Sequence, residues 1–268
     1  MNRNIGFIGA GNMGKAMIKG FLSSGICTSD QLIVSDQNTI FLEELSNEFS
    51  IETTRDNKVT AQSANFLILA VKPQLYELVI SEIRDVISNN TVIVSIAAGL
   101  KMAQIVTWFQ RPVKLIRIMP NTPAMVLEAM SAIVPGSDVT EDELCYVLQL
   151  FQSIGRAEVV SESLMDTVTG VSGSSPAYVY LFIEAMADAA VADGMPRDKA
   201  YTFAAQSVLG AAKMVLATGQ HPGQLKDAVC SPGGTTIEAV TILEEKGLRS
   251  AVICAQRACV NKSRDLGK

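Results

Sequence analysis

The chain has few groups that could carry acid–base or metal chemistry. Its 268 residues include one histidine, His221, and five cysteines, none of which forms a Cys-x-x-Cys pair. Scattered thiols and a single imidazole do not make a recognisable metal site, so we expect no metal ion. We also find no Ser-His-Asp set, no Gly-x-Ser-x-Gly elbow and no Cys-His pairing. We expect the thiols to be reduced and mostly buried.

Positive charge and long apolar runs are scarce as well. The net charge is −5, and no basic patch appears, so a nucleic-acid partner is not expected. The longest apolar stretch, residues 177–192, carries Glu184 and Asp188 and is short for a bilayer span, so we expect no membrane partner. The N-terminus enters a strand-like run without a signal-peptide pattern, which predicts a cytoplasmic protein.

The most informative feature present is a glycine motif near the N-terminus. An apolar run from Ile5 leads directly into Gly9-Ala10-Gly11-Asn12-Met13-Gly14, and a helical pattern follows. In a dinucleotide site the first glycine allows the tight turn, the second lets backbone approach the pyrophosphate, and the third permits close helix packing. An acidic residue, Asp36, ends the next predicted strand. The motif predicts a nucleotide site, and the alternative is a glycine turn that serves packing alone.

Alternating patterns in the first half predict a doubly wound α/β sheet of the Rossmann type. Continuous apolar runs, typical of strands buried on both faces, predict strands at residues 5–9, 32–35, 66–71, 91–95, 114–118 and, more weakly, 130–134. Between and after them, helices are predicted at residues 15–24, 39–48, 76–86, 102–108 and 141–153, the last with Thr140 as N-cap.

The composition changes after Val160, and the rest of the chain reads as helices separated by Gly and Pro. We therefore predict a dinucleotide-binding domain at residues 1–160 and an all-α domain at residues 161–268. The predicted helices start at Ser175-Pro176 (N-cap and first position), Pro196, Pro222, Thr236 and Leu248. Residues 177–193 are apolar on nearly all sides, which favours burial against a second chain, hence a homodimer at least. The alternative is a central helix in a monomer.

Three segments follow predicted strands and should line the cofactor cleft, because ligands bind at the carboxyl ends of parallel strands. They are residues 70–73, 95–99 and 119–123. Small residues and prolines in these segments could pack against the flat ring of a cofactor. The alternative is that they are ordinary loop residues. Lys72 could be a catalytic lysine, but a position near a nucleotide phosphate or on a solvated loop is favoured.

Two further turns lie in the helical half. Ser231-Pro232-Gly233-Gly234-Thr235-Thr236 places glycines and hydroxyls before a helix, where backbone N–H groups can hold a carboxylate. The alternative is a simple turn with a threonine N-cap. A similar turn is Ser172-Gly173-Ser174-Ser175-Pro176. It could be a plain helix cap, or a segment whose backbone approaches a ligand closely.

Over essentially its whole length the chain resembles the Δ1-pyrroline-5-carboxylate reductase family. The resemblance is carried by the glycine motif, by Ala70-Val71-Lys72-Pro73 and by Met119-Pro120-Asn121-Thr122-Pro123. It continues through residues 170–178 and is most specific at His221-Pro222-Gly223-Gln224-Leu225-Lys226-Asp227 and the following Ser231–Thr236 turn. The resemblance implies the last step of proline synthesis, in which a nicotinamide cofactor reduces a cyclic imine. It also implies a Rossmann domain and a helical dimerisation domain, with dimers assembled into rings such as a pentamer of dimers.

The resemblance also implies site residues. The cofactor would contact the glycine turn, the second strand's end and the loops beside the nicotinamide: Ile8, Gly9, Ala10, Gly11, Asn12, Met13, Gly14, Ser35, Asp36, Asn57, Ala70, Val71, Lys72, Pro73, Ile96, Ala97 and Ala98. The substrate would be held by Ser231, Gly234, Thr235 and Thr236, with Glu162 nearby and Thr236 as the catalytic residue that orients the ring nitrogen. A dedicated general acid is unnecessary, because the imine is basic enough to be protonated near neutral pH.

The family more often uses NADPH, and NADPH is the expected cofactor, with NADH possible. Asp36 departs from the small hydroxyl residues of NADPH-using relatives, and an acid there normally binds a ribose and repels a 2′-phosphate.

Two other functions are alternatives to the reductase. A β-hydroxyacid-type dehydrogenase would need a catalytic lysine, but Lys199, Lys213 and Lys226 lack the sequence context for it. A nucleotide-sensing regulator would not need a second ligand site at the Gly-Gly-Thr-Thr turn.

Overall fold

The computed structural model describes residues 3–266, which form two compact units. The first unit comprises residues 3–173 and 259–266, and the second comprises residues 174–258. The predicted domain boundary after residue 160 precedes a short helical segment that packs within the first unit. Met165 of that segment is buried with Ala132 and Val134 of the sheet, so this apolar contact moves the division between the compact units to residue 173.

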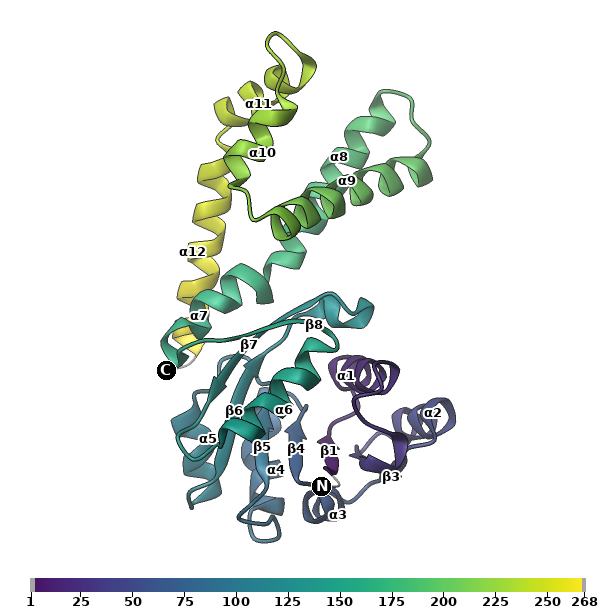
Figure 1. Ribbon diagram of the computed structural model, residues 1–268, viewed down its shortest axis with the longest axis vertical. Coiled ribbons are helices and arrows are strands. Elements are labelled where there is room, and N and C mark those ends of the chain that lie inside the picture. The colour runs from purple at the N-terminus through teal and green to yellow at the C-terminus, as the bar shows by residue number, and fades with distance from the viewer. Residues whose placement is uncertain (1–2, 267–268) are drawn as a thin grey trace. The chain divides into compact units, whose positions relative to one another are not determined.

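The first unit contains one eight-stranded sheet in the order β3-β2-β1-β4-β5-β6-β7-β8, whose arrows lie side by side in Figure 1. The strands β1 to β6 pair in parallel, β7 is antiparallel to β6, and β8 is parallel to β7. Their bounds are β1 Ile5–Ile8, β2 Leu32–Ser35, β3 Glu52–Thr54, β4 Phe66–Leu69, β5 Val92–Ser95, β6 Lys114–Met119, β7 Ala129–Pro135 and β8 Gly155–Val159. The order of β1 to β6 is that of the Rossmann fold, which confirms the predicted class.

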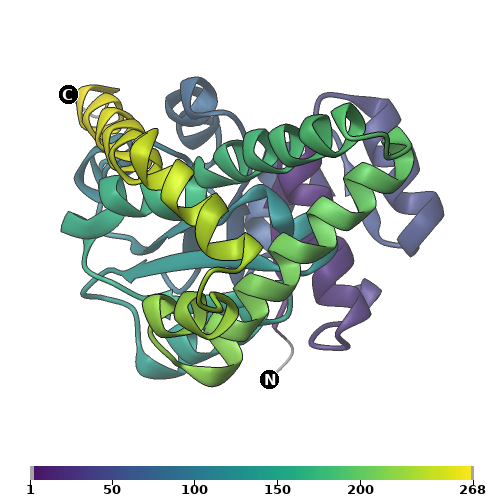
Figure 2. The ribbon, with the colours of Figure 1, turned by 90° about the horizontal axis from the view of Figure 1, so that it is seen from above.

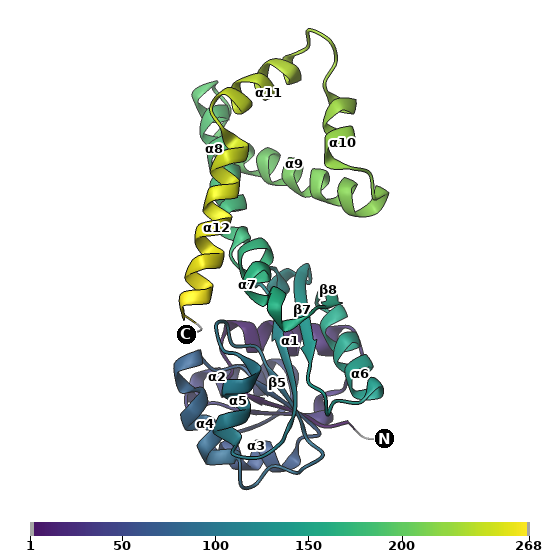
Figure 3. The ribbon, with the colours of Figure 1, turned by 90° about the vertical axis from the view of Figure 1, so that its left-hand side faces the viewer.

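Helices cover both faces of the sheet, which explains why its central strands are continuous apolar runs. One face carries α1 (Asn12–Ser23), α2 (Thr39–Phe49) and α6 (Glu141–Gln152). The other carries α3 (Asn57–Ser63), α4 (Tyr76–Ile83) and α5 (Met102–Phe109). Figure 3 shows α4 and α5 on one side and α6 on the other. The two hydrophobic cores therefore lie above and below a sheet whose central strands are buried.

Two strands and one α-helix within residues 3–160 were not predicted. Strands β3 and β8 are the two edges of the sheet, and both carry exposed polar or charged residues, so neither shows a continuous apolar run. Helix α3 has only seven residues, too few for a clear periodicity, and its N-cap is Asp56, whose carboxylate accepts the N–H of Lys58. The predicted cap of α6 is confirmed, because Thr140 and Glu143 form a reciprocal capping box.

After residue 160 the described chain contains no strand, as predicted. A 3₁₀ turn at Glu162–Leu164, α7 (Met165–Val168) and a π-helical turn at Thr169–Gly173 lie in the first unit. The following helices are α8 (Ser175–Ala192), α9 (Arg197–Thr218), α10 (Pro222–Val229), α11 (Thr235–Glu245) and α12 (Leu248–Leu266), whose last turns belong to the first unit. Three predicted starts are wrong by one residue: the N-cap of α8 is Ser174 rather than Ser175, α9 begins at Arg197 with Pro196 as its N-cap, and α11 begins at Thr235 rather than Thr236.

Helices α8 and α9 pack on each other as a helical hairpin, which Figure 2 shows from above. Ala187 is the one buried residue of α8, whereas Leu181 is 66% exposed and Phe203 of α9 is also 66% exposed. Large apolar side chains left in water at this density mark a surface that another protein covers. The alternative of a central helix buried within a monomer is wrong for this hairpin.

Candidate functional site

The three glycines of the motif lie in a turn between β1 and α1, and the fold constrains them differently. Gly9 has a φ of 107°, and a Cβ there would stand 2.7 Å from the carbonyl oxygen of Ala70. A Cβ on Gly14 would stand 2.6 Å from the carbonyl oxygen of Gly9. Gly11 has an ordinary φ of −68°, and a Cβ there would meet no atom within 4 Å. The fold therefore requires glycine at positions 9 and 14, while the space at Gly11 is open to a ligand.

The same turn offers unsatisfied donors. Gly11 is the N-cap of the 12-residue helix α1 and provides no side-chain cap. The N–H groups of the first helical turn are therefore available at the positive end of the helix dipole. Gly9 donates its own N–H to the carbonyl of Ser35 at 2.8 Å, and Ala70 donates to Ile8 at 2.8 Å. The ends of β1, β2 and β4 thus meet at this turn, as a cofactor site at the carboxyl ends of parallel strands requires.

Asp36 lies beside this turn and is already engaged with backbone. One carboxylate oxygen accepts the N–H of Ala10 at 2.6 Å, and the other accepts the N–H of Asn38 at 2.8 Å. The carboxylate is half-buried. Asp36 therefore links the second strand to the glycine turn, a contact that the position of the residue in the sequence did not indicate.

Ser35 and Asn57 are buried and bonded to each other. The Ser35 hydroxyl donates to the Asn57 side-chain oxygen at 2.9 Å, and the Asn57 amide donates to Glu82 at 2.7 Å. Their side chains thus hold the ends of β2 and α3 together from within. Their side-chain polar atoms are therefore used inside the protein.

Tyr76, which no sequence pattern singled out, supports the two loops predicted beside the nicotinamide. Its hydroxyl donates to the carbonyl of Leu69 at 2.6 Å and accepts from the Ser95 hydroxyl at 3.1 Å. Leu69 ends β4 before Ala70, and Ser95 ends β5 before Ile96, so the phenol ties the two loops together. Burial raises the pKa of Tyr76 to about 12, so the phenol remains neutral and keeps its proton for Leu69. A buried tyrosine in an otherwise apolar helix face was the available signal.

Beyond β6, the structure joins two segments that the sequence singled out separately. The buried amide of Asn121 donates to the carbonyl of Ser172 at 2.9 Å, and its oxygen accepts the N–H of Met130 at 2.9 Å. A Cβ on Gly173 would stand 2.8 Å from the Met119 side chain. The loop at 119–123 therefore packs against the π-helical turn that precedes α8.

Glu162 lines a polar cavity of about 390 Å³ in the first unit. Its carboxylate accepts from the Arg117 guanidinium at 2.9 Å and from the N–H of Met102, the first residue of α5, at 2.8 Å. The remaining lining consists of Gly99, Lys101, Ser163, Met165, Asp166 and Arg264. In this position Glu162 closes an ion pair and caps a helix, and it belongs to a different compact unit from the other predicted substrate residues.

Those other residues, Ser231, Gly234, Thr235 and Thr236, meet in one turn of the second unit. Gly234 is the N-cap of the 11-residue helix α11, has no side-chain cap, and donates its N–H to Ser231 at 3.1 Å. The alternative of a threonine N-cap is therefore wrong. Because no hydroxyl caps α11, the first-turn N–H groups and the hydroxyls of Thr235 and Thr236 remain available as donors.

His221 has the structural role that its place before a proline suggested. Its Nδ1 accepts the N–H of Gly223 at 3.0 Å and so caps α10. The thiols differ from expectation: none of the five forms a disulfide, but only Cys27 is buried, while Cys145 and Cys254 are exposed. Among the described residues, no helix is long and apolar enough to cross a membrane.

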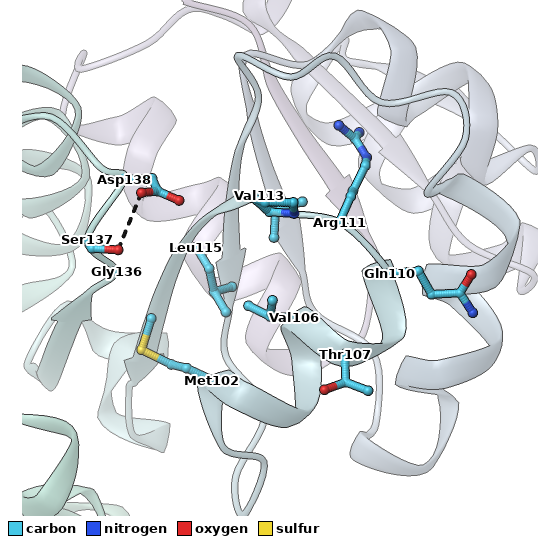
Figure 4. Close-up of a pocket in the computed structure, with 11 residues that line it drawn as sticks. Met102, Val106, Thr107, Gln110, Arg111, Val113, Leu115, Gly136, Ser137 and Asp138 are labelled. Atoms are coloured by element: carbon cyan, nitrogen blue, oxygen red, sulfur yellow. Dashed lines mark hydrogen bonds between the residues drawn. The ribbon is translucent and has the colours of Figure 1, made fainter.

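A further cavity, of about 540 Å³, lies between α5, the α5–β6 connection and the β7–α6 connection, and Figure 4 shows its lining. Apolar side chains such as Val106 and Leu115 dominate it, and its Arg111 is bonded to Asn89 and to the carbonyl of Ile87. None of the predicted site residues contributes to this cavity.

Comparisons with known proteins agree with this arrangement. Residues 162–266 match the family described as pyrroline-5-carboxylate reductase dimerisation, and residues 4–99 match the NADP oxidoreductase, coenzyme F420-dependent family. The Escherichia coli pyrroline-5-carboxylate reductase is 50% identical over 268 residues, which covers all of both chains. The chain belongs to the pyrroline-5-carboxylate reductase family.

Other members of this reductase family are similar over almost their whole length. The Arabidopsis thaliana enzyme is 39% identical, with 98% of this chain and 95% of that protein covered. Among solved structures, the Coxiella burnetii pyrroline-5-carboxylate reductase has a TM-score of 0.94 at 33% identity, with both chains fully covered. The Plasmodium falciparum pyrroline carboxylate reductase, solved with NADP bound, has a TM-score of 0.89 at 30% identity and covers 100% of this chain and 99% of its own.

Proposed function

We propose that the chain catalyses the NADPH-dependent reduction of 1-pyrroline-5-carboxylate, a cyclic imine, to L-proline, the last step of proline biosynthesis. The main support for cofactor binding is the open space at Gly11. The fold itself requires the two flanking glycines of the motif, Gly9 and Gly14, but not Gly11. Family membership over the full length supports the substrate. NADH remains a possible second cofactor, because Asp36 lies at the end of β2.

The residues around the glycine turn fit a dinucleotide. The N–H groups at the start of α1 bind the pyrophosphate, and Gly11 leaves room for it. The loops at 70–73 and 96–98 flank the nicotinamide, held in place by Tyr76. Lys72 is exposed and forms no ion pair among the described residues, which suits a contact with a phosphate. Ser35 and Asn57 support the adenosine side from below.

The Ser231–Thr236 turn binds the substrate. Backbone N–H groups at the start of α11 hold the carboxylate, and the Thr236 hydroxyl is bonded to the ring nitrogen. Thr236 thereby orients the imine for hydride transfer, and positioning of this kind lowers a barrier by several kcal/mol. NADPH supplies the hydride when it is bound. Since the substrate imine is protonated near neutral pH, the protein needs no general acid.

The exposed apolar hairpin of α8 and α9 supports a homodimer at least, and the region matches the family's dimerisation domain. We propose that dimers assemble further into a ring such as a pentamer of dimers. The proposed location is the cytoplasm, which is in keeping with five cysteines that form no disulfide.

The decisive test is a steady-state assay of the purified protein with pyrroline-5-carboxylate and each of NADPH and NADH, followed by nicotinamide absorbance. Turnover with NADPH and formation of proline are expected. A protein that binds either cofactor but reduces no imine would favour a nucleotide sensor. Activity on 2- or 3-hydroxy acids instead would favour the β-hydroxyacid class.

A further inference from the structure

The ends of β2 and β3 form a small polar platform at one edge of the sheet. Ser35 pairs with Thr54 in the parallel register, and the N–H of Asp36 continues the ladder to the carbonyl of Thr54 at 3.3 Å. The Gln37 side chain then donates to the carbonyl of Arg55 at 3.2 Å. These bonds hold the backbone of Arg55 beside Asp36 and Gln37, at the end of β2 where the adenosine ribose of a dinucleotide lies.

The negative charges of this platform are already compensated by backbone donors. Both oxygens of Asp36 accept N–H groups, from Ala10 and Asn38. The Asp56 carboxylate accepts the N–H of Lys58 and caps α3. Bonds to the charged form of a carboxylate stabilise its charge locally. Neither acid therefore pairs with the neighbouring guanidinium.

The Arg55 side chain, in contrast, is exposed and has no hydrogen bond or ion pair with any other described residue. A free guanidinium held by its backbone at the end of β3 is a suitable partner for a phosphate, which it can bind through two parallel N–H bonds. NADPH differs from NADH in this region by a 2′-phosphate in place of a hydroxyl.

We propose that Arg55 binds the 2′-phosphate of NADPH and thereby sets the preference of this enzyme for NADPH over NADH. This inference rests on the proposed function. The proposal explains how a chain with an acid at position 36 can use NADPH. Asp36 is held towards the glycine turn by its bond to Ala10, and Arg55, which follows the adjacent strand β3, supplies the cation for the 2′-phosphate.

The test measures binding directly, by titrating the full-length protein with NADPH and with NADH and following nicotinamide fluorescence. Arg55→Gln is expected to weaken NADPH binding about tenfold, the size of one charge-assisted contact at an exposed site, and to change NADH binding less than about twofold. Arg55→Lys should retain part of the preference. Adenosine 2′,5′-bisphosphate and 5′-AMP, used as competitors, report the same difference without the nicotinamide half.

Arg156→Gln is the matched control. Arg156 is an exposed arginine of β8, at the opposite edge of the same sheet, and the substitution removes the same charge. It should leave both affinities unchanged. The wild-type preference for NADPH should also fall between about 50 and 300 mM salt, and this salt dependence should be weaker in Arg55→Gln, because screening acts on the same charge pair.

Equal losses for NADPH and NADH in Arg55→Gln, no loss for NADPH, or an equal effect of Arg156→Gln would each overturn the proposal. A wild-type protein that prefers NADH would overturn it as well. The proposed function is tested separately by reduction of pyrroline-5-carboxylate. If the wild type and Arg55→Gln both reduce the imine but share one NADPH to NADH ratio, only the role of Arg55 fails. If the wild type reduces no imine with either cofactor, the proposed function fails.

Discussion

The Arg117 guanidinium donates to the Glu162 carboxylate at 2.9 Å, joining strand β6 to the segment that leads into α7. The Arg117 side chain is 7% exposed, and its Nε has no partner among the described residues. Glu162 thus compensates a nearly buried charge while it caps α5 through Met102. This contact fixes a residue that the family resemblance placed near the substrate.

We predict that Glu162→Ala destabilises the protein by about 3 kcal/mol, because it leaves a nearly buried guanidinium without its carboxylate. Glu162→Gln should cost less, since the amide oxygen still accepts the N–H of Met102. Urea unfolding of the two variants measures the difference. A rise in KM for the imine with unchanged stability would instead show that Glu162 is a direct substrate ligand.

Gly11→Val should abolish NADPH binding and leave the melting temperature nearly unchanged. The Cβ at position 11 has free space and a permitted backbone conformation in the protein alone, but it occupies the path of the pyrophosphate. Gly14→Ala is the contrasting variant, because its Cβ would lie 2.6 Å from the Gly9 carbonyl and should lower stability. Normal NADPH affinity in Gly11→Val would remove the basis for the site.

Asp36→Ser should raise the ratio of kcat/KM for NADPH to that for NADH. The repulsion removed is at the lower end of roughly 1–4 kcal/mol, because the carboxylate is already bonded to two backbone N–H groups. Binding of both cofactors should also weaken slightly, as Ala10 loses its acceptor. An unchanged ratio would mean that Asp36 acts on the turn alone.

For the substrate turn, we predict that Thr236→Ala lowers kcat/KM for the imine by one to two orders of magnitude, or roughly 1.5–3 kcal/mol for a bond to a charged group. The dissociation constant of NADPH should barely change. Thr241→Ala is a control in the same helix, since its hydroxyl is bonded to the carbonyl of Ile237. A cofactor-binding defect in Thr236→Ala would assign the turn to the other ligand.

Leu181→Glu should weaken self-association by several kcal/mol, because it would bury an unpaired charge in a dimer contact. Analytical ultracentrifugation at micromolar concentration measures the shift from dimer to monomer. Val159→Glu, which changes an exposed apolar residue of the first unit, should not alter the sedimentation. A wild-type protein that sediments as a monomer contradicts the proposed dimer.

The sequence by itself determined the Rossmann class, the central strands and the helical second half. These depend on local patterns: continuous apolar runs, caps such as Thr140 and breaks such as Gly219. It also located the glycine turn, because the spacing of Gly9, Gly11 and Gly14 is a property of one short segment. The edge strands β3 and β8 were not predicted from the sequence. A strand exposed at the edge of a sheet needs no apolar run, because it is stabilised by pairing with its neighbour.

Only the tertiary structure decided which residues distant in the sequence form hydrogen bonds and ion pairs with each other. The bond of Asp36 to Ala10, the pair of Asn57 with Ser35, and the ion pair of Glu162 with Arg117 each connect segments far apart in the chain. The open space at Gly11 is likewise a three-dimensional property, because it depends on the fold placing no atom within 4 Å of a Cβ there. A sequence pattern records which residues are present, whereas hydrogen bonds and free volume depend on which groups the fold brings within about 3 Å of each other.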